Sequence, residues 1–148
     1  MEENNNQEVI QYIVAKIGHE QYGVNIQHVH NIERMLRITR VPKAPYYIKG
    51  VVNLRGDIIP VMSLRLKFRL DPDEYTNDTR IIIVKIDGNP MGFIVDEVKE
   101  VINLTEDNIE KIAKDSSDEK NIYVQGVGKI GKELVTLLNI DGLINTND

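Results

Sequence analysis

Two segments of this chain recur, in the same order, in its second half. Residues 23–32 align without a gap on residues 92–101, and both read glycine, apolar, any residue, apolar, two polar residues, valine, two polar residues, apolar. Residues 50–64 align equally well on residues 126–140. Two matches in one order indicate a duplicated structural unit. We therefore expect two lobes in which the matched segments occupy equivalent positions.

Short runs rich in valine and isoleucine alternate with turn residues along the chain. The turn Arg55-Gly56-Asp57 between two apolar runs is typical of a β-hairpin, because glycine readily adopts positive φ. Many short strands at regular spacing indicate small antiparallel barrels, whose closure removes exposed strand edges. We expect an all-β fold with short helices, in which two pseudo-duplicated barrel lobes share a hydrophobic core.

The polar, acidic stretch at residues 71–78 divides the two halves. The expected organisation is a polar tail at 1–8, a first barrel lobe at 9–70, a linker at 71–78, a second lobe with a C-terminal helical turn at 79–144, and a tail at 145–148. Within the first lobe the apolar period changes from two to about three. Ile26, Val29 and Ile32 then predict one face of a short helix, with Asn25 as its N-cap.

Composition disfavours several classes of protein. The net charge of −5 makes neutralisation of a nucleic-acid backbone an unlikely role, and the absence of cysteine removes disulfides and thiolate chemistry. The N-terminus is acidic and polar, unlike a secretory signal, and every apolar run is too short to span a membrane. The expectation is a soluble, cytoplasmic protein that makes no direct membrane insertion.

No reaction centre is predicted. His28 and His30 stand two apart, so on a helix they point to different faces and do not share a metal. The glycines at 126, 128 and 131 fit the dinucleotide fingerprint by letter, yet a strand-like run follows where that fingerprint needs a helix. We expect a glycine-rich hairpin there. No catalytic residue, cofactor or metal is expected, and the chain is predicted not to be an enzyme.

Two features suggest a protein interface. Arg55 is predicted at a hairpin tip, where its planar guanidinium can bond while its stem packs. Val29, Val98 and Val101 lie in the repeated segments, so each half can present an apolar strip. The alternative reading is that the three valines are ordinary core residues.

Several motifs resemble the CheW coupling proteins of bacterial chemotaxis, over roughly Val9 to Ile144. The resemblance is carried by Tyr22-Gly23-Val24-Asn25-Ile26, Tyr47-Ile48-Lys49-Gly50-Val51-Val52-Asn53-Leu54-Arg55-Gly56, Pro60-Val61, Leu64-Arg65 and Asp96-Glu97-Val98-Lys99-Glu100-Val101. It implies two intertwined five-stranded barrels around a shared core. It also implies a non-catalytic adaptor that joins the cytoplasmic tips of methyl-accepting chemoreceptors to the regulatory domain of the histidine kinase CheA.

Carried over residue by residue, the resemblance implies a receptor-binding groove between the lobes that involves Val29, Arg55, Val98 and Val101. The chain departs from the family at Asn31, where the family often has glutamate, and Glu33 follows on a different face of the expected helix. The alternatives are a related module of the kinase or of a receiver protein, and a small-barrel nucleic-acid-binding or other interaction module. The charge and the lack of interleaved basic and aromatic residues disfavour nucleic acid.

Overall fold

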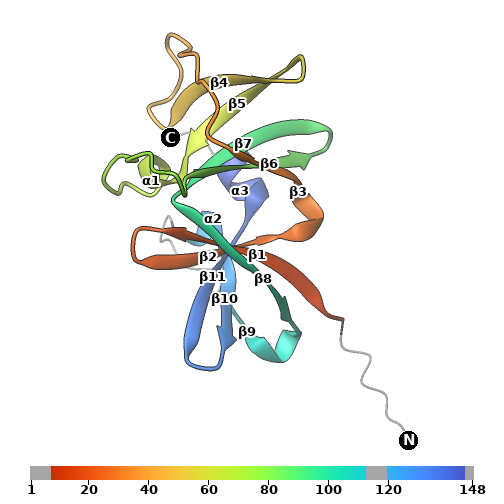
Figure 1. Cartoon of the computed structure of the whole chain (residues 1–148). Coiled ribbons are helices and arrows are strands. Elements are labelled where there is room, and N and C mark those ends of the chain that lie inside the picture. Colours follow the sequence, from red (N-terminus) through yellow and green to blue (C-terminus); the bar gives the residue numbers. More distant parts are fainter. Residues whose placement is uncertain (1–7, 113–119, 146–148) are drawn as a thin grey trace, which may run out of the picture.

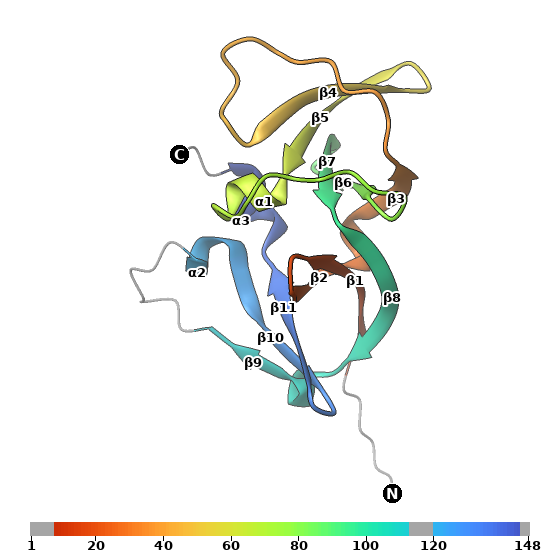
Figure 2. The ribbon, with the colours of Figure 1, turned by 60° about the vertical axis from the view of Figure 1, so that its left-hand side comes forward.

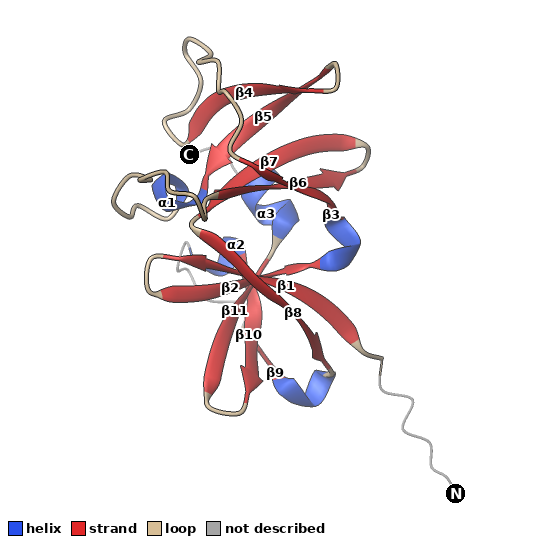
Figure 3. Cartoon of the chain, in the orientation of Figure 1, coloured by secondary structure: helices blue, strands red, loops and turns tan. Residues whose placement is uncertain are grey.

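Two β-sheets joined along a shared core make up most of the structure, a computed structural model that describes residues 8–112 and 120–145 (Figure 1). The tails expected at 1–8 and 145–148 lie almost entirely outside the described residues. Helices are confined to short segments between strands or after the last one (Figure 3). They are η1 (Ile26–His28), α1 (Leu64–Lys67), η2 (Glu106–Asn108), α2 (Lys120–Tyr123) and α3 (Ile140–Asn145). The fold is thus all-β with short helices, as predicted, although one of the two sheets has six strands where the expected barrels have five.

Each sheet takes strands from both halves of the chain. Sheet A has the order β8-β1-β2-β11-β10-β9, and sheet B the order β3-β6-β7-β5-β4. The strands of sheet A are β1 (Ile10–Ile17), β2 (Glu20–Asn25), β8 (Glu97–Leu104), β9 (Ile109–Lys111), β10 (Val124–Ile130) and β11 (Glu133–Leu138). Those of sheet B are β3 (Val29–Arg34), β4 (Ile48–Leu54), β5 (Asp57–Ser63), β6 (Arg80–Ile86) and β7 (Asn89–Val95).

The two halves have exchanged their first hairpins. The β1–β2 hairpin of the first half lies in sheet A among strands of the second half, and the β6–β7 hairpin of the second half lies in sheet B. The sheets therefore do not follow the expected division into lobes at 9–70 and 79–144. The physical reason is that a hairpin signal is local, whereas the choice of sheet depends on which apolar face the hairpin covers. This exchange of hairpins agrees with the intertwined barrels that the resemblance implies.

The repeated segments occupy equivalent positions, as the duplication predicts. Gly23 of β2 lies opposite Leu137 of β11 in a parallel pair, and Gly92 of β7 lies opposite Val61 of β5 in the same way. The sequence alignment matches these residues with one another. Irregularities in the strands are repeated too, with register shifts at Ile48/Gly50 in β4 and at Val124/Gly126 in β10. The second half therefore copies the pairing geometry as well as the residue pattern.

The helix expected across Ile26, Val29 and Ile32 was wrong. Asn25 does cap a helical turn, since its Oδ1 accepts a hydrogen bond from the Gln27 backbone N–H at 2.9 Å. That turn ends at His28, and the chain then enters β3, which pairs antiparallel with β6. A register shift between Val29 and Asn31 produces the apolar spacing of three. A β-bulge adds a residue to a strand and so mimics helical periodicity.

The core continues from one sheet into the other. Tyr12 and Val14 of β1 face a cluster inside sheet A, whereas Ile13 and Ala15 face the cluster shared by both sheets. In β6, Ile81 and Ile83 face a cluster inside sheet B, and Ile82 and Val84 face the shared cluster. Both strands are consequently buried on both faces, which explains why they read as continuous apolar runs.

A buried lysine adds a polar link within the shared core. Lys67 of α1 is 2% exposed, and its Nζ lies 3.8 Å from the ring centroid of Tyr47 and 5.3 Å from that of Tyr123. An ammonium group over aromatic faces gains cation–π attraction, which is stronger when water is excluded. The contact connects α1, which follows β5 of sheet B, to α2, which precedes β10 of sheet A.

Each sheet closes toward a barrel through a strand extension at the same relative position. In sheet A the chain runs from β8 through η2 into β9, which pairs with β10 at Val127 and Glu110. In sheet B the equivalent closure is one bridge between Thr39 and Val51, with both backbone hydrogen bonds at 2.8 Å. Gly50, beside this bridge, has a φ of 146°, and a Cβ there would lie 2.1 Å from the Thr39 carbonyl oxygen.

We predict that Gly50→Ala destabilises the protein far more than Gly88→Ala. Both glycines have positive φ, but a Cβ at Gly88 meets no atom within 4 Å. Gly88→Ala should cost about 1 kcal/mol through backbone strain alone. Gly50→Ala adds a clash with backbone and should cost at least about 3 kcal/mol. Urea unfolding followed by circular dichroism measures both, and equal losses would show that the Thr39–Val51 closure is not tight.

Candidate functional site

Arg55 lies at the tip of the β4–β5 hairpin, as predicted. Its φ is 53°, and the turn is fixed by the Gly56 backbone N–H, which donates to Asn53 Oδ1 at 3.0 Å. The Arg55 side chain is exposed and makes no ion pair or side-chain hydrogen bond with the described part of the chain. Its guanidinium is therefore available to an outside group, and the fold gains little from its charge.

Val29 and Val98 are half-buried at equivalent places in β3 and β8. Val29 pairs with Val84 of β6, and Val98 pairs with Ala15 of β1. A register shift follows directly after each valine, so β3 and β8 have the same irregularity at the same position. Both pack against the shared core. The two readings of these valines, interface and core, are thus both compatible with their position, because one side of each contacts the core and the other reaches solvent.

Val101 is more exposed than the other two predicted valines, at 51%. Its counterpart in the first half is Ile32, which is 39% exposed in β3. Ile32 is not among the residues predicted for the interface, although the alignment of residues 23–32 on 92–101 places it opposite Val101. The duplication was therefore the signal that could have found it. Val29, Ile32, Val98 and Val101 together form what we call the valine strip.

β3 and β8, which carry the valine strip, lie along the same side of the molecule as the tip of the β4–β5 hairpin, which carries Arg55. In Figures 1 and 2, β3 lies between the tip of the β4–β5 hairpin and β8, along the right-hand side of both views. The strip therefore spans the boundary between the sheets, and the hairpin tip stands at one end of the same side. A partner that reaches all four predicted residues must be extended across this boundary.

The polar residues of β3 differ from the expectation based on a helix. Asn31 and Glu33 are two apart in a strand and so share one face, opposite to that of Ile32. The Asn31 Nδ2 donates to Glu33 Oε2 at 2.5 Å. Glu33 is therefore held beside position 31 rather than on another face, because β3 is a strand.

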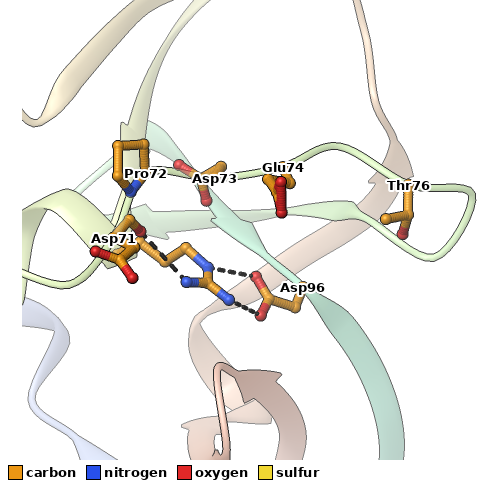
Figure 4. Close-up of a pocket in the computed structure, with 7 residues that line it drawn as sticks. Asp71, Pro72, Asp73, Glu74, Thr76 and Asp96 are labelled. Carbon is orange, nitrogen blue, oxygen red and sulfur yellow. Dashed lines mark hydrogen bonds and ion pairs between the residues drawn. The ribbon is translucent and has the colours of Figure 1, made fainter.

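An ion pair connects the two sheets at the point where the chain crosses between them (Figure 4). Asp96 lies between β7 of sheet B and β8 of sheet A, and accepts hydrogen bonds from Arg65 Nε at 2.9 Å and Arg65 Nη2 at 2.6 Å. The Gly18 backbone N–H, in the β1–β2 turn, donates to the same carboxylate at 2.8 Å. Asp96 thus ties α1, the β1–β2 turn and the crossover together.

The electrostatics at Asp96 favour its charged form. Partial burial alone would raise the pKa of Asp96, but the hydrogen bonds from Arg65 and Gly18 outweigh burial and lower it. The sequence does not predict this pair. Arg65 and Asp96 are 31 residues apart, and the two motifs that contain them carry the resemblance without indicating that they contact each other. Only the fold brings them together.

Asp73 is the second acid of this region. The Ser63 hydroxyl donates to its Oδ2, while Oδ1 is buried and has no hydrogen-bond partner in the described structure. Burial raises the pKa of Asp73, and this effect exceeds the lowering by the Ser63 hydrogen bond and by Arg65. A cavity of about 580 Å³ lies beside Asp73, bounded by Arg65, Asp71, Glu74 and Asp96.

The described residues contain no group of three or more side chains arranged to hold a metal ion.

The glycine-rich segment forms a hairpin, as expected. Gly126 and Gly128 lie in β10, Gly131 has a φ of 59° in the turn, and β11 follows. The arrangement lacks the helix that a dinucleotide site requires after its glycines.

No helix in the described ranges is long and apolar enough to cross a membrane.

We predict that Asp96→Asn lowers the free energy of unfolding by about 2 kcal/mol at pH 7, because it removes charge-assisted hydrogen bonds between partly buried groups. The lowered pKa means that ionised Asp96 stabilises the fold above the unfolded pKa of about 3.9. That contribution is lost as pH falls through the folded pKa. The difference between wild type and variant should therefore begin to shrink near pH 4 and should vanish only at pH values below the lowered folded pKa.

Glu97→Gln serves as the matched control, since the neighbouring carboxylate of Glu97 makes no ion pair or side-chain hydrogen bond with described residues. Urea unfolding at several pH values measures both variants. A difference for Asp96→Asn that persists unchanged at low pH, or an equal loss for Glu97→Gln, would contradict the role given to the ion pair.

Comparisons with known proteins agree with this architecture. The model of the CheW-like domain family matches residues 11–148. The chain is 36% identical over 142 residues to the chemotaxis protein CheW of Helicobacter pylori, covering 96% of this chain and 86% of that protein. It is 32% identical over 133 residues to the chemotaxis protein CheW of Bacillus subtilis, covering 90% and 85%.

A solved structure gives the same result. The crystal structure of the scaffolding protein TtCheW from Thermoanaerobacter tengcongensis superposes with a TM-score of 0.85 at 34% identity, covering 95% of each chain. Sequence and fold therefore lead to one conclusion. The chain belongs to the CheW-like domain family.

Proposed function

We propose that this protein is a chemotaxis adaptor that couples the cytoplasmic tips of methyl-accepting chemoreceptors to the regulatory domain of the histidine kinase CheA. The observation that carries the proposal is membership of the CheW-like family over nearly the whole chain, with relatives named as chemotaxis proteins and a structural neighbour named as a scaffolding protein. The protein would act in the cytoplasm, where these partners present their signalling domains.

The adaptor does its work by binding rather than by catalysis. Its prominent polar cluster, Arg65 with Asp96, is satisfied internally and connects the two sheets. Arg55 is the one cation among the four predicted site residues. It lies at an exposed hairpin tip rather than in a cleft with a second reactive group. Such features support recognition of a protein surface.

The receptor-binding surface in this proposal consists of Val29, Arg55, Val98 and Val101, with Ile32 as a neighbour. The valine strip offers apolar area at the boundary between the sheets, and Arg55 offers a planar donor at its end. A helical receptor tip laid across β3 and β8 would bury the strip and bring a carboxylate or carbonyl group to Arg55. An apolar centre flanked by arginine is a common composition of interfaces.

We predict that Arg55→Ala weakens binding to a chemoreceptor cytoplasmic fragment by about thirty-fold. Truncating an interface anchor costs roughly 2 kcal/mol, whereas an exposed change alters folding stability by only about 0.5 kcal/mol. The thermal midpoint should therefore stay nearly unchanged, and binding to the CheA regulatory domain should change less. Isothermal titration calorimetry against both partners measures the effect.

Arg69→Ala is the matched control, because Arg69 is also an exposed arginine with positive φ, at 62°. It follows α1 and lies outside the proposed surface, so its receptor affinity should equal that of wild type. Wild-type affinity for Arg55→Ala, or a loss of affinity equal to that of Arg69→Ala, would place the receptor site elsewhere. Absence of binding by the wild-type protein to both partners would contradict the adaptor function itself.

A further inference from the structure

A second surface lies at the outer end of sheet B, in the segment that connects β3 to β4. Residues 34–49 hold five of the chain's 18 cations and none of its 23 acidic residues. The five cations are Arg34, Arg37, Arg40, Lys43 and Lys49. In a chain of net charge −5, this makes one local surface of opposite sign to the whole. We call residues 34–49 the basic strap.

The cations of the basic strap are not neutralised within the protein. The first four are exposed and Lys49 is half-buried. None of the five makes an ion pair or a side-chain hydrogen bond with the described residues, in contrast to Arg65 and Lys129, which pair with Asp96 and Glu110. No ion pair with the described residues therefore offsets their mutual repulsion, and a partner that supplies negative charge would be attracted to them.

A groove with largely apolar and aromatic lining residues runs beside two of these cations. It has a volume of about 490 Å³, and its walls are formed by Met35, Leu36, Ile38, Tyr46, Ile48 and Tyr75, with Arg40 and Lys49 also lining it. Tyr46 and Tyr75 are 51% and 49% exposed, so both rings present a face to solvent. Tyrosine, methionine and arginine side chains around an apolar hollow are characteristic of protein interfaces.

The position of the strap leaves it accessible. The connection between β3 and β4 forms the outer end of the molecule, beyond β4 and away from sheet A (Figure 2). Thr39 of the strap forms one β-bridge with Val51 of β4. Neither the valine strip nor the Arg65–Asp96 pair belongs to this groove.

We propose that the basic strap and its groove form a docking site for an acidic segment of a partner protein that carries a large apolar side chain. The carboxylates would pair with Arg40 and Lys49, while the apolar side chain enters between Tyr46 and Tyr75. Charge complementarity selects the acidic partner, and the groove selects an apolar side chain over a featureless polyanion. The net charge of −5 would repel an anionic bilayer or a phosphate backbone from the remainder of the surface. This site is independent of the proposed receptor surface.

The test uses the full chain and a fluorescently labelled, glutamate-rich peptide with one phenylalanine, measured by fluorescence anisotropy at two salt concentrations. Saturable binding that weakens with salt is expected, because the cations are exposed. The double variant Arg40→Glu/Lys49→Glu, which reverses the two cations that line the groove, should lose about tenfold or more in affinity. The matched control is Lys85→Glu/Lys132→Glu, which reverses two exposed cations on the β6–β7 and β10–β11 hairpins and should bind like wild type.

A second pair of measurements tests the groove. Replacing the phenylalanine of the peptide by serine should weaken binding to the wild-type protein, and Tyr46→Ser should remove that difference between the peptides. Three results would overturn the proposal: no saturable binding of the phenylalanine peptide, equal loss in the control variant, or tighter binding of anionic vesicles or of a single-stranded oligonucleotide. None of them bears on receptor binding through Arg55, so failure here is distinguishable from failure of the adaptor function.

Discussion

The shared core, created by the exchange of hairpins, is the constraint on which the rest of the structure depends. Because β1 lies in sheet A and β6 in sheet B, each strand is covered on both faces, by the barrel it belongs to and by the core between the barrels. Separating the barrels would expose Ile13 and Ala15 on one side and Ile82 and Val84 on the other. This exposure would cost a free energy of about 25 cal/mol per Å² of apolar surface. The two barrels therefore form one body rather than two lobes on a linker.

This constraint also positions the surfaces through which the protein would act. Val29 and Val98 are anchored in the shared core, so the valine strip has a fixed geometry across the boundary between the sheets. Asp96 reinforces the boundary at the crossover through Arg65 and Gly18. The basic strap, by contrast, lies at the end of sheet B farthest from the shared core, where the Thr39–Val51 bridge holds it. A rigid centre with distinct surfaces around it is a suitable arrangement for a scaffold, since partners can bind without competing for the same residues.

The sequence predicted those features that depend on local pattern and on repetition. The duplication correctly made Gly23 and Gly92 equivalent, and the turn at Gly56 correctly predicted the hairpin that exposes Arg55. The helix over Ile26–Ile32 was wrong, because a bulged strand produces the same apolar spacing. The hairpin exchange and the Arg65–Asp96 pair were not predictable from residue pattern, since both depend on contacts between segments far apart in the chain. The positions of Val29, Arg55, Val98 and Val101 are established, and their role in binding stays a prediction.

Native-state hydrogen exchange tests the shared core most directly. If the barrels form one body, the amides of Val14 in β1 and Ile82 in β6 should open with the same free energy, equal to that of global unfolding, and respond identically to added denaturant. Asp96→Asn should lower both by the same amount. A β6 amide that exchanges through a smaller opening while β1 remains protected, or the reverse, would show that the barrels unfold separately and would contradict the account.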